Sequence, residues 1–383
     1  MLPVRQEVAD FIWRRDGCPP VDPENIFLTN GASDGVRAVY DVLLRDPAEG
    51  FRDGVLTPIP QYPLYSARST LTGGTLVPYH LDETNGWSVS VEKLRGALTV
   101  ARAGGVCVRA IVVINPGNPT GQVLSEADVK GIIELAATEN LAIVADEVYQ
   151  DNIWGARPFI SFKRAACEMG FDAAAPGAVA GEAAVGFAPA LQIFSLHSTS
   201  KGFLGECGFR GGYMELHGVP ADVHAQFYKL ACISLCSNTL GQIMTGLMVN
   251  PPTAGDASYA QYAAERDAIL SSLKRRATAL VAALNALEGV TCQPAEGAMY
   301  AFPRLMLPAK AVVAAAAAGV PADEFYCLKV LDRTGIILVP GSGFGQEEGT
   351  YHFRSTFLPQ ESKMPAIVES LSKAHAAFLA EYA

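Results

Sequence analysis

The sequence predicts an α/β fold in which a large domain with a mostly parallel sheet flanked by helices is followed by a smaller α+β domain. Strand-like and helix-like patterns alternate through the first two-thirds of the 383 residues, and such alternation implies βα units around a parallel sheet. A long amphipathic segment over 259–287 then leads to short strands, turns and a C-terminal helix. The expected parts are an N-terminal helix packing with the small domain (1–25), a large domain (26–256), an interdomain helix (257–287) and a small domain (288–383).

Local patterns support each predicted element. An apolar stripe with helical spacing begins at Val4. Ser125 followed by Asp128 is a capping-box pattern ahead of another apolar stripe. Runs of β-branched and other apolar residues, such as 110–114, predict strands. The predicted strands span 26–29, 110–114, 141–145, 191–196 and 211–216; the predicted helices are those after Val4 and Ser125, those over 33–44, 259–287 and 311–318, and one from about residue 363.

Composition argues against several classes of protein. The net charge is −10, and no cluster of lysine or arginine stands out, which argues against nucleic acid or an anionic membrane as a partner. No apolar run is long enough to span a bilayer. The eight cysteines form no C-x-x-C pair and follow no secretory signal, so we expect reduced thiols in an intracellular protein. The cytoplasm is the expected compartment, and mitochondria or peroxisomes are the alternatives. The histidines show no metal-ligand spacing.

Two stretches depart from an ordinary globular pattern. The first helix begins directly after Met1, so either the protein begins abruptly or the chain is part of a longer one. Residues 171–190 are rich in alanine, glycine and proline and contain only two acids. This composition predicts a flexible surface loop.

Lys201 is the most informative residue of the chain. It ends the run Ser198-Thr199-Ser200-Lys201 after a predicted strand, and a glycine-rich turn and Arg210 follow it. An amine among hydroxyl donors and beside an arginine suits a carbonyl cofactor that carries a phosphate, namely pyridoxal phosphate, with Lys201 as the Schiff-base lysine. Taken alone, the same pattern also suits a solvated surface lysine.

Asp146 and Tyr149 follow the predicted strand over 141–145. A carboxylate at the end of this strand could pair with the protonated pyridine nitrogen and so keep the ring able to accept electrons. Tyr149 could donate to the phenolate oxygen of the cofactor. The alternative is an aspartate that caps the next helix, with the tyrosine in the core.

Asn118 lies in a turn with two prolines and two glycines, 115–121, that follows another predicted strand. A plain turn needs fewer special residues than this one. We therefore expect a rigid loop that holds the Asn118 amide against the cofactor oxygen and a substrate carboxylate.

Gly31-Ala32-Ser33 lies where a strand meets a helix N-terminus, a natural seat for a phosphate. Ser198 and Arg210 would supply further donors. Ser33 could instead be a simple N-cap.

Two residues further along the chain complete the predicted site. Tyr62, next to a proline, could stack on the pyridine ring, and loop packing is the alternative that is more common for such an aromatic. Arg354, in an alternating strand pattern of the second domain, suits a substrate α-carboxylate. A surface salt bridge is the alternative there.

Together and in this order, these motifs resemble the class I aminotransferases of pyridoxal phosphate fold type I. The likeness spans nearly the whole chain and is closer to the alanine aminotransferase subgroup. It rests on the phrases Gln61-Tyr62-Pro63-Leu64-Tyr65, Ser195 to Gly202, Gly208 to Tyr213, Val339 to Gly345 and Gly349 to Arg354.

The resemblance implies a role for each matching residue and a seven-stranded type of sheet. It makes Lys201, Asp146 and Tyr149 catalytic and assigns the substrate carboxylate to Asn118 and Arg354. The cofactor-binding residues it implies are Ala32, Ser33, Tyr62, Asn118, Asp146, Tyr149, Ser198, Lys201 and Arg210.

The activity that the resemblance implies is transfer of an amino group from L-alanine to 2-oxoglutarate, with glutamate and glyoxylate as the alternative pair. Family members are homodimers with sites at the interface, and Ser237-Asn238 resembles a segment that reaches the neighbouring site. The chain differs from the family pattern at two places, since it lacks the usual region before Val4 and contains an apparent insertion over 171–190. A truncated, non-catalytic protein that binds the cofactor or a subunit is therefore a second hypothesis.

Overall fold

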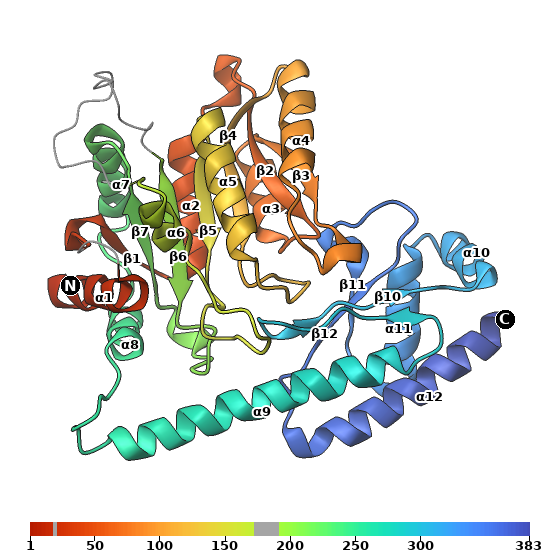
Figure 1. Ribbon diagram of the computed structural model, residues 1–383. Coiled ribbons are helices and arrows are strands. Elements are labelled where there is room, and N and C mark those ends of the chain that lie inside the picture. The colour runs from red at the N-terminus through yellow and green to blue at the C-terminus, as the bar shows by residue number, and fades with distance from the viewer. Residues whose placement is uncertain (18–20, 172–190) are drawn as a thin grey trace.

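The computed structural model describes residues 1–17, 21–171 and 191–383 (Figure 1). The surface loop predicted over 171–190 lies outside these residues, apart from Phe171. The helices are α1 (Leu2–Asp16), α2 (Ala32–Leu43), α3 (Leu64–Leu71), α4 (Val91–Ala103), α5 (Glu126–Glu139), α6 (Phe162–Glu168), α7 (Ala221–Ile233), α8 (Thr239–Val249), α9 (Tyr259–Asn285), α10 (Ala309–Ala318), α11 (Ala322–Thr334) and α12 (Met364–Tyr382).

Seven strands form one large sheet in the order β1-β7-β6-β5-β4-β2-β3. They are β1 (Ile26–Thr29), β2 (Asp53–Ile59), β3 (Thr75–His80), β4 (Cys107–Ile114), β5 (Ala142–Asp146), β6 (Ile193–Ser198) and β7 (Gly212–His217). Strand β7 runs antiparallel to both of its neighbours, and the other neighbouring pairs are parallel. The predicted α/β class with a mostly parallel sheet is confirmed.

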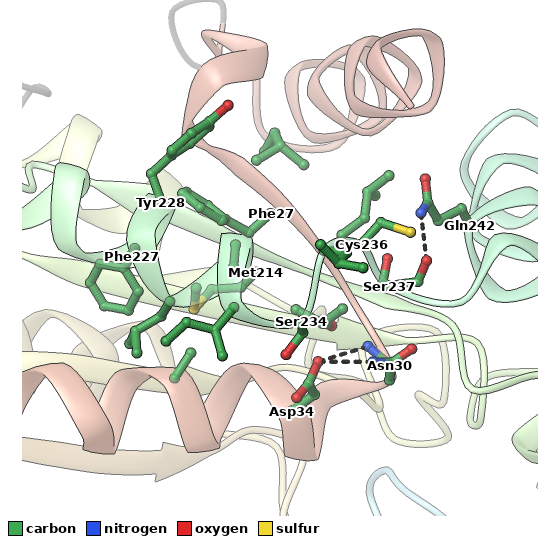
Figure 2. A pocket seen from close by; sticks show the side chains of 18 of the residues that line it. Phe27, Asn30, Asp34, Met214, Phe227, Tyr228, Ser234, Cys236, Ser237 and Gln242 are labelled. Carbon is green, nitrogen blue, oxygen red and sulfur yellow. Dashed lines mark hydrogen bonds between the residues drawn. The ribbon is translucent and has the colours of Figure 1, made fainter.

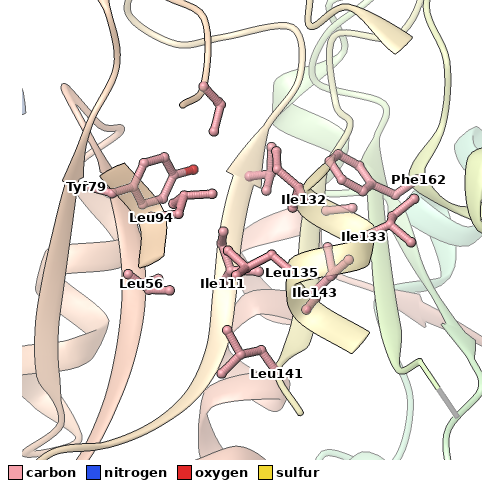
Figure 3. Close-up of a cluster of buried hydrophobic side chains, with 14 of the residues drawn as sticks. Leu56, Tyr79, Leu94, Ile111, Ile132, Ile133, Leu135, Leu141, Ile143 and Phe162 are labelled. Carbon is pink, nitrogen blue, oxygen red and sulfur yellow. The ribbon is translucent and has the colours of Figure 1, made fainter. Parts of the chain in front are cut away.

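Helices cover both faces of this sheet (Figure 1). Because successive side chains of a strand point to opposite faces, β4 divides its apolar residues between two clusters. Ile111 and Val113 join the cluster beneath α4, α5 and α6, part of which Figure 3 shows. Ala110 and Val112 join a second cluster beneath α2 and α7. A strand buried on both faces is a near-continuous apolar run, as the sequence pattern indicated.

The C-terminal part has its own core. Long helix α9 and helix α12 lie along one side of it (Figure 1). Its strands are β8 (Val290–Thr291), β9 (Tyr300–Ala301), β10 (Arg304–Leu305), β11 (Val339–Pro340) and β12 (Phe353–Thr356), arranged as a β11-β12-β9 sheet and a β10-β8 pair. Leu280, Tyr326, Phe353 and Phe378 are buried in this core.

In the part of the chain that the structure describes, no single helix has both the length and the apolar character to cross a membrane, and only the bent pair α10 and α11 passes that test jointly, by length and composition.

Helix α1 does not pack with the small domain as expected. Its apolar stripe, including Val8 and Ile12, lies against Ile26 of β1, Tyr213 of β7 and Val249 of α8. Arg14 adds a hydrogen bond from Nη2 to the carbonyl of Val249, 2.8 Å away. The spacing of apolar residues correctly predicted which face of α1 is buried, but it carries no information about which surface buries it.

A segment of the C-terminal part returns to the carboxyl-terminal edge of the large sheet. The amide of Gly297 donates to the carbonyl of Gly121 at 2.8 Å, and the amide of Ala298 donates to the carbonyl of Asn152 at 3.0 Å. These bonds bring β9, which begins at Tyr300, next to the loops that follow β4 and β5.

Candidate active site

A cavity of about 170 Å³ opens where β5 and β6 end, and we call it the site cavity. In parallel sheets, ligands bind beyond the carboxyl ends of the strands. Every residue predicted to bind the cofactor lines this cavity: Ala32, Ser33, Tyr62, Asn118, Asp146, Tyr149, Ser198, Lys201 and Arg210.

Lys201 lies in the turn after β6, and a buried amide holds that turn. The side chain of Asn152 accepts a hydrogen bond from the amide of Gly202 at 3.0 Å and donates to its carbonyl at 3.2 Å. Gly202 has φ +67°, a conformation that favours glycine. The Nζ atom of Lys201 lies 3.5 Å from the hydroxyl of Tyr300 and 5.3 Å from the centre of the Tyr149 ring.

Asp146 is the last residue of β5, and its two carboxylate oxygens differ in their hydrogen bonding. The hydroxyl of Tyr65 donates to Oδ2 at 2.6 Å. The buried Oδ1 atom has no hydrogen-bond partner within residues 1–17, 21–171 and 191–383. Burial raises the pKa of Asp146 above its ordinary value, while the hydrogen bonds from Tyr65 and from the amide of Val148 and the charge of Lys201 lower it. An unpaired buried carboxylate oxygen is costly, and a protonated ring nitrogen would satisfy it.

Gly31 and Arg210 form a cradle at the N-terminus of α2. Gly31 has φ +87° and is the N-cap residue, with no side-chain cap. Ser33 is therefore inside the first turn and is not the N-cap. A Cβ atom on Gly31 would lie 2.7 Å from Nη2 of Arg210, so any larger residue would force that guanidinium to move. Free helix amides with an arginine beside them suit a phosphate.

Arg210 is fixed by backbone carbonyls. Its Nη2 atom donates to the carbonyl of Asn30 and its Nη1 atom to the carbonyl of Cys207, each at 3.0 Å. Ser198, on the same side of the cavity, donates from Oγ to the carbonyl of Gly211 at 3.3 Å. The predicted phosphate donors are thus brought together.

Asn118 and Arg354 meet at the opposite end of the site. Arg354 donates from Nη1 to Oδ1 of Asn118 at 3.0 Å. Its guanidinium carbon lies 4.3 Å from the centre of the Tyr300 ring and 4.8 Å from that of Phe344. No carboxylate of the described residues pairs with Arg354, so the geometry does not support a surface salt bridge and leaves the arginine available for a substrate carboxylate.

The hydroxyl of Tyr149 lies within hydrogen-bond distance of two other side chains. Asn118 donates to it from Nδ2 at 3.4 Å, and the hydroxyl of Tyr300 lies 3.1 Å away. Burial raises the pKa of Tyr149 well above its ordinary value, and the neighbouring Tyr300 and Asp146 add to the effect while Arg354 opposes it. A phenol held neutral in this way can act as a hydrogen-bond donor.

Tyr62 lies on the wall of the site cavity with 40% of its surface exposed. No ring of the described residues stacks on it, so its face is available for another ring.

Sequence reasoning missed several residues of this site. Tyr65 and Phe344 lie within motifs that carry the resemblance but had no predicted role, and no motif contains Asn152 or Tyr300. Tyr65 and its hydrogen-bond partner Asp146 are 81 positions apart in the sequence, so no local spacing could have linked the two residues.

A larger pocket of about 380 Å³ adjoins the phosphate end of the site, and we call it the side pocket (Figure 2). Phe27, Met214 and Phe227 form an apolar wall of it, and Asn30 and Asp34 form a polar end. None of the predicted site residues lines the side pocket.

Comparison with known proteins identifies the family. The family model described as aminotransferase class I and II matches residues 2–371. The chain belongs to the class I and II aminotransferases. Aminotransferases of this class use pyridoxal phosphate, and the unpaired Asp146 oxygen, the amine of Lys201 and the cradle beside Arg210 fit that group.

Two curated relatives and one solved structure place the chain within the family. It is 51% identical to the mitochondrial alanine aminotransferase 1 of Arabidopsis thaliana over 99% of its own length and 66% of the relative. It is 50% identical to glutamate–glyoxylate aminotransferase 1 of the same plant, over 99% of the chain and 75% of that relative. The chain thus spans about two-thirds to three-quarters of the length of these relatives.

Alanine aminotransferase from Pyrococcus furiosus has a similar structure, with a TM-score of 0.78 and 24% identity over 100% of this chain and 82% of the other. This similarity confirms the fold type I architecture.

Proposed function

We propose that this protein transfers an amino group from L-alanine to 2-oxoglutarate, with formation of pyruvate and L-glutamate. The observation that carries the proposal is the placement of three groups in one site: the amine of Lys201, the unpaired oxygen of Asp146 and the guanidinium of Arg354. Identity of 51% to an alanine aminotransferase supports the substrate pair.

Pyridoxal phosphate, when bound, supplies an aldehyde that condenses with amines and a ring that accepts electrons from the substrate α-carbon. The Oδ1 atom of Asp146 would hold a proton on the ring nitrogen, and Tyr65 would keep that carboxylate oriented through its 2.6 Å bond to Oδ2. Ser33, Ser198 and Arg210 would bind the phosphate. Tyr62 would cover one face of the ring.

Lys201 is the group that moves the proton of the substrate. Its Nζ atom would take the proton from the α-carbon and return it to the other end of the reacting system, because a neutral amine can serve as base and then as acid. Such a positioned base contributes roughly 10²–10⁴-fold to the rate. Its neighbours Asp146 and Tyr149 are buried.

The substrate end depends on Arg354. A guanidinium offers two parallel donors to a carboxylate, and the rings of Tyr300 and Phe344 hold it in one orientation. Both the amino acid and the 2-oxo acid carry that carboxylate, so one arginine serves both halves of the reaction.

Glutamate and glyoxylate form the second candidate pair. The 50% identity to a glutamate–glyoxylate aminotransferase favours it almost as strongly as the first pair.

The test is a panel of amino donors and oxo acids on the purified protein loaded with pyridoxal phosphate. We expect alanine-dependent formation of glutamate from 2-oxoglutarate, and visible absorbance of the bound cofactor that Lys201→Ala changes. Lys130→Ala is the matched control, because Lys130 is a partly exposed lysine paired with Glu126 on the surface of α5.

Other results would point elsewhere. Loss of the amino group as ammonia, with no new amino acid, would indicate an elimination lyase on the same fold. Cofactor absorbance without any turnover would favour the non-catalytic hypothesis. Absence of cofactor absorbance, or absorbance that Lys201→Ala leaves unchanged, would refute the proposal as a whole.

Arg354→Lys gives an independent check of the substrate end. We expect the KM of alanine to rise by at least ~10-fold, since a lysine cannot make the paired hydrogen bonds or stack between the rings. An unchanged KM would remove Arg354 from the substrate site.

We also propose that the protein is a homodimer in an intracellular compartment. Exposed apolar side chains, including Ile233, Leu235, Leu240 and Leu247, follow one another on α7, the next turn and α8. A monomer rarely exposes so many large apolar residues in one region. The turn that joins α7 to α8 also reaches the phosphate end of the site, because the amide of Asn238 donates to Oδ1 of Asn30 at 2.8 Å. Light scattering that shows only monomers at micromolar concentration would contradict the dimer.

A further inference from the structure

We propose that Tyr300 is a positioning residue of this site, whose hydroxyl holds the amine of Lys201 and directs the hydroxyl of Tyr149, while its ring supports Arg354. The inference rests on the proposed function, because it assigns a role within that reaction.

Tyr300 reaches the site from the C-terminal part of the chain. It begins β9, which pairs with β12 so that Tyr300 lies opposite Thr356. Its side chain is 8% exposed. One residue therefore touches both ends of the site. It comes from the same small sheet as Arg354 and from a different sheet than the one that leads into Lys201 and Tyr149.

Tyr300 contacts Lys201, Tyr149 and Arg354, and Asn118 links the last two of these. Its hydroxyl lies 3.5 Å from Nζ of Lys201 and 3.1 Å from the hydroxyl of Tyr149. Tyr149 accepts from Asn118, Asn118 accepts from Arg354, and Arg354 lies over the Tyr300 ring. These contacts connect the lysine to the arginine through neighbouring side chains.

Donor counting sets the direction of the hydrogen bonds. In the cofactor-free protein a charged lysine donates and cannot accept, so the oxygen of Tyr300 accepts from Lys201 and its single hydrogen is left for Tyr149. The oxygen of Tyr149 then accepts from both Tyr300 and Asn118. Its own hydrogen remains free to point into the site cavity, where a ring oxygen of the cofactor would accept it.

A packing role alone does not explain the hydroxyl. The rings of Tyr149 and Tyr300 meet edge to face, with centres 5.9 Å apart and an interplanar angle of 83°. Phenylalanine would keep this contact and the contact with Arg354. A buried hydroxyl requires partners, and Lys201 and Tyr149 are the two that the geometry offers.

The test compares Tyr300→Phe with Tyr326→Phe. Tyr326 is a buried tyrosine of the same C-terminal part that donates to, or accepts from, Nδ1 of His375 at 3.0 Å, and it does not line the site cavity. Each variant is loaded with pyridoxal phosphate, and the visible spectrum is recorded against pH. This spectrum reports the proton held between the Lys201 nitrogen and the ring oxygen and does not depend on turnover.

We expect the spectral midpoint of Tyr300→Phe to rise by less than about 1 pH unit, the equivalent of losing one whole hydrogen bond to the ring oxygen. The reason is that a weaker donor at Tyr149 leaves more negative charge on the ring oxygen, which then holds the proton more tightly. Tyr326→Phe should titrate like the unmodified protein. The KM of alanine should change little in Tyr300→Phe, because the ring beneath Arg354 remains, and should rise in Tyr300→Leu.

An unchanged spectral midpoint in folded Tyr300→Phe would overturn the inference while leaving the proposed function intact. If the unmodified protein bound no pyridoxal phosphate, the proposed function itself would fail. Should Tyr300→Phe not fold, 3-fluorotyrosine at position 300 keeps the packing and makes the hydroxyl a stronger donor to Tyr149, so the midpoint should fall instead of rise. A midpoint that this replacement does not move would likewise refute the role.

Discussion

Replacing Tyr65 by phenylalanine tests whether the ring-nitrogen carboxylate depends on its buried partner. The substitution keeps the aromatic ring in the core cluster that also contains Tyr40. It removes one atom, the hydroxyl that donates to Oδ2 of Asp146 at 2.6 Å. Since the other carboxylate oxygen has no partner among the described residues, this bond is the main side-chain support of the ionised form.

The size of the effect follows from the kind of bond. A hydrogen bond to a charged group is worth ~1.5–3 kcal/mol, and 1.36 kcal/mol corresponds to a tenfold change. The free protein can relieve the loss by protonating Asp146, whereas binding of the protonated ring requires the carboxylate. We therefore expect pyridoxal phosphate to bind Tyr65→Phe at least ~10-fold more weakly near pH 7.

The sign of the pH dependence can be worked out in the same way. Burial raises the pKa of Asp146, and the bond from Tyr65 lowers it. Without that bond the pKa of Asp146 rises further, so the carboxylate becomes protonated at a higher pH. Binding weakens as the pH falls through this pKa, and in Tyr65→Phe that weakening should begin at a higher pH than in the unmodified protein.

The assay is an equilibrium titration of the cofactor-free protein with pyridoxal phosphate, followed by absorbance across a range of pH. Tyr40→Phe is the control, because Tyr40 is a buried tyrosine of the same cluster whose hydroxyl makes no hydrogen bond to Asp146. Equal dissociation constants for Tyr65→Phe and Tyr40→Phe, with the same pH dependence, would refute the reasoning.

Two further predictions concern charge burial and backbone shape. Lys163 and Glu215 form a buried ion pair at 2.5 Å, so Lys163→Met should destabilise the protein by ~3–5 kcal/mol, and a second change, Glu215→Leu, should recover much of that loss. Urea unfolding measures the free energy of unfolding of both variants. A double variant that is no more stable than the single variant would contradict the argument. Gly31→Ala should weaken binding of pyridoxal phosphate by at least ~10-fold relative to pyridoxal, because a Cβ atom there would displace Arg210. Gly50→Ala shares the positive φ, at +85°, but meets no atom within 4 Å, so it should lose stability alone.

Much of the fold could be predicted because its signals are local. The capping box at Ser125 and Asp128 forms as expected. Strands β4, β5 and β6 coincide with apolar runs, since a strand covered on both faces needs apolar residues at nearly every position. Strands β2 and β3 were not among the predicted strands. Each contains a proline, Pro58 or Pro78, and proline within a run weakens the signal of a strand.

The sequence by itself predicted which residues would carry the proposed chemistry. Lys201, Asp146, Asn118 and Arg354 follow or lie on short apolar segments, and their types limit what they can do. Only the tertiary structure decided how they are supported. Tyr65, Asn152 and Tyr300 lie far along the chain from the groups that they hold. The physical reason is that hydrogen bonds between separate strands and loops depend on how sheets and helices pack, and spacing along one segment does not encode that packing.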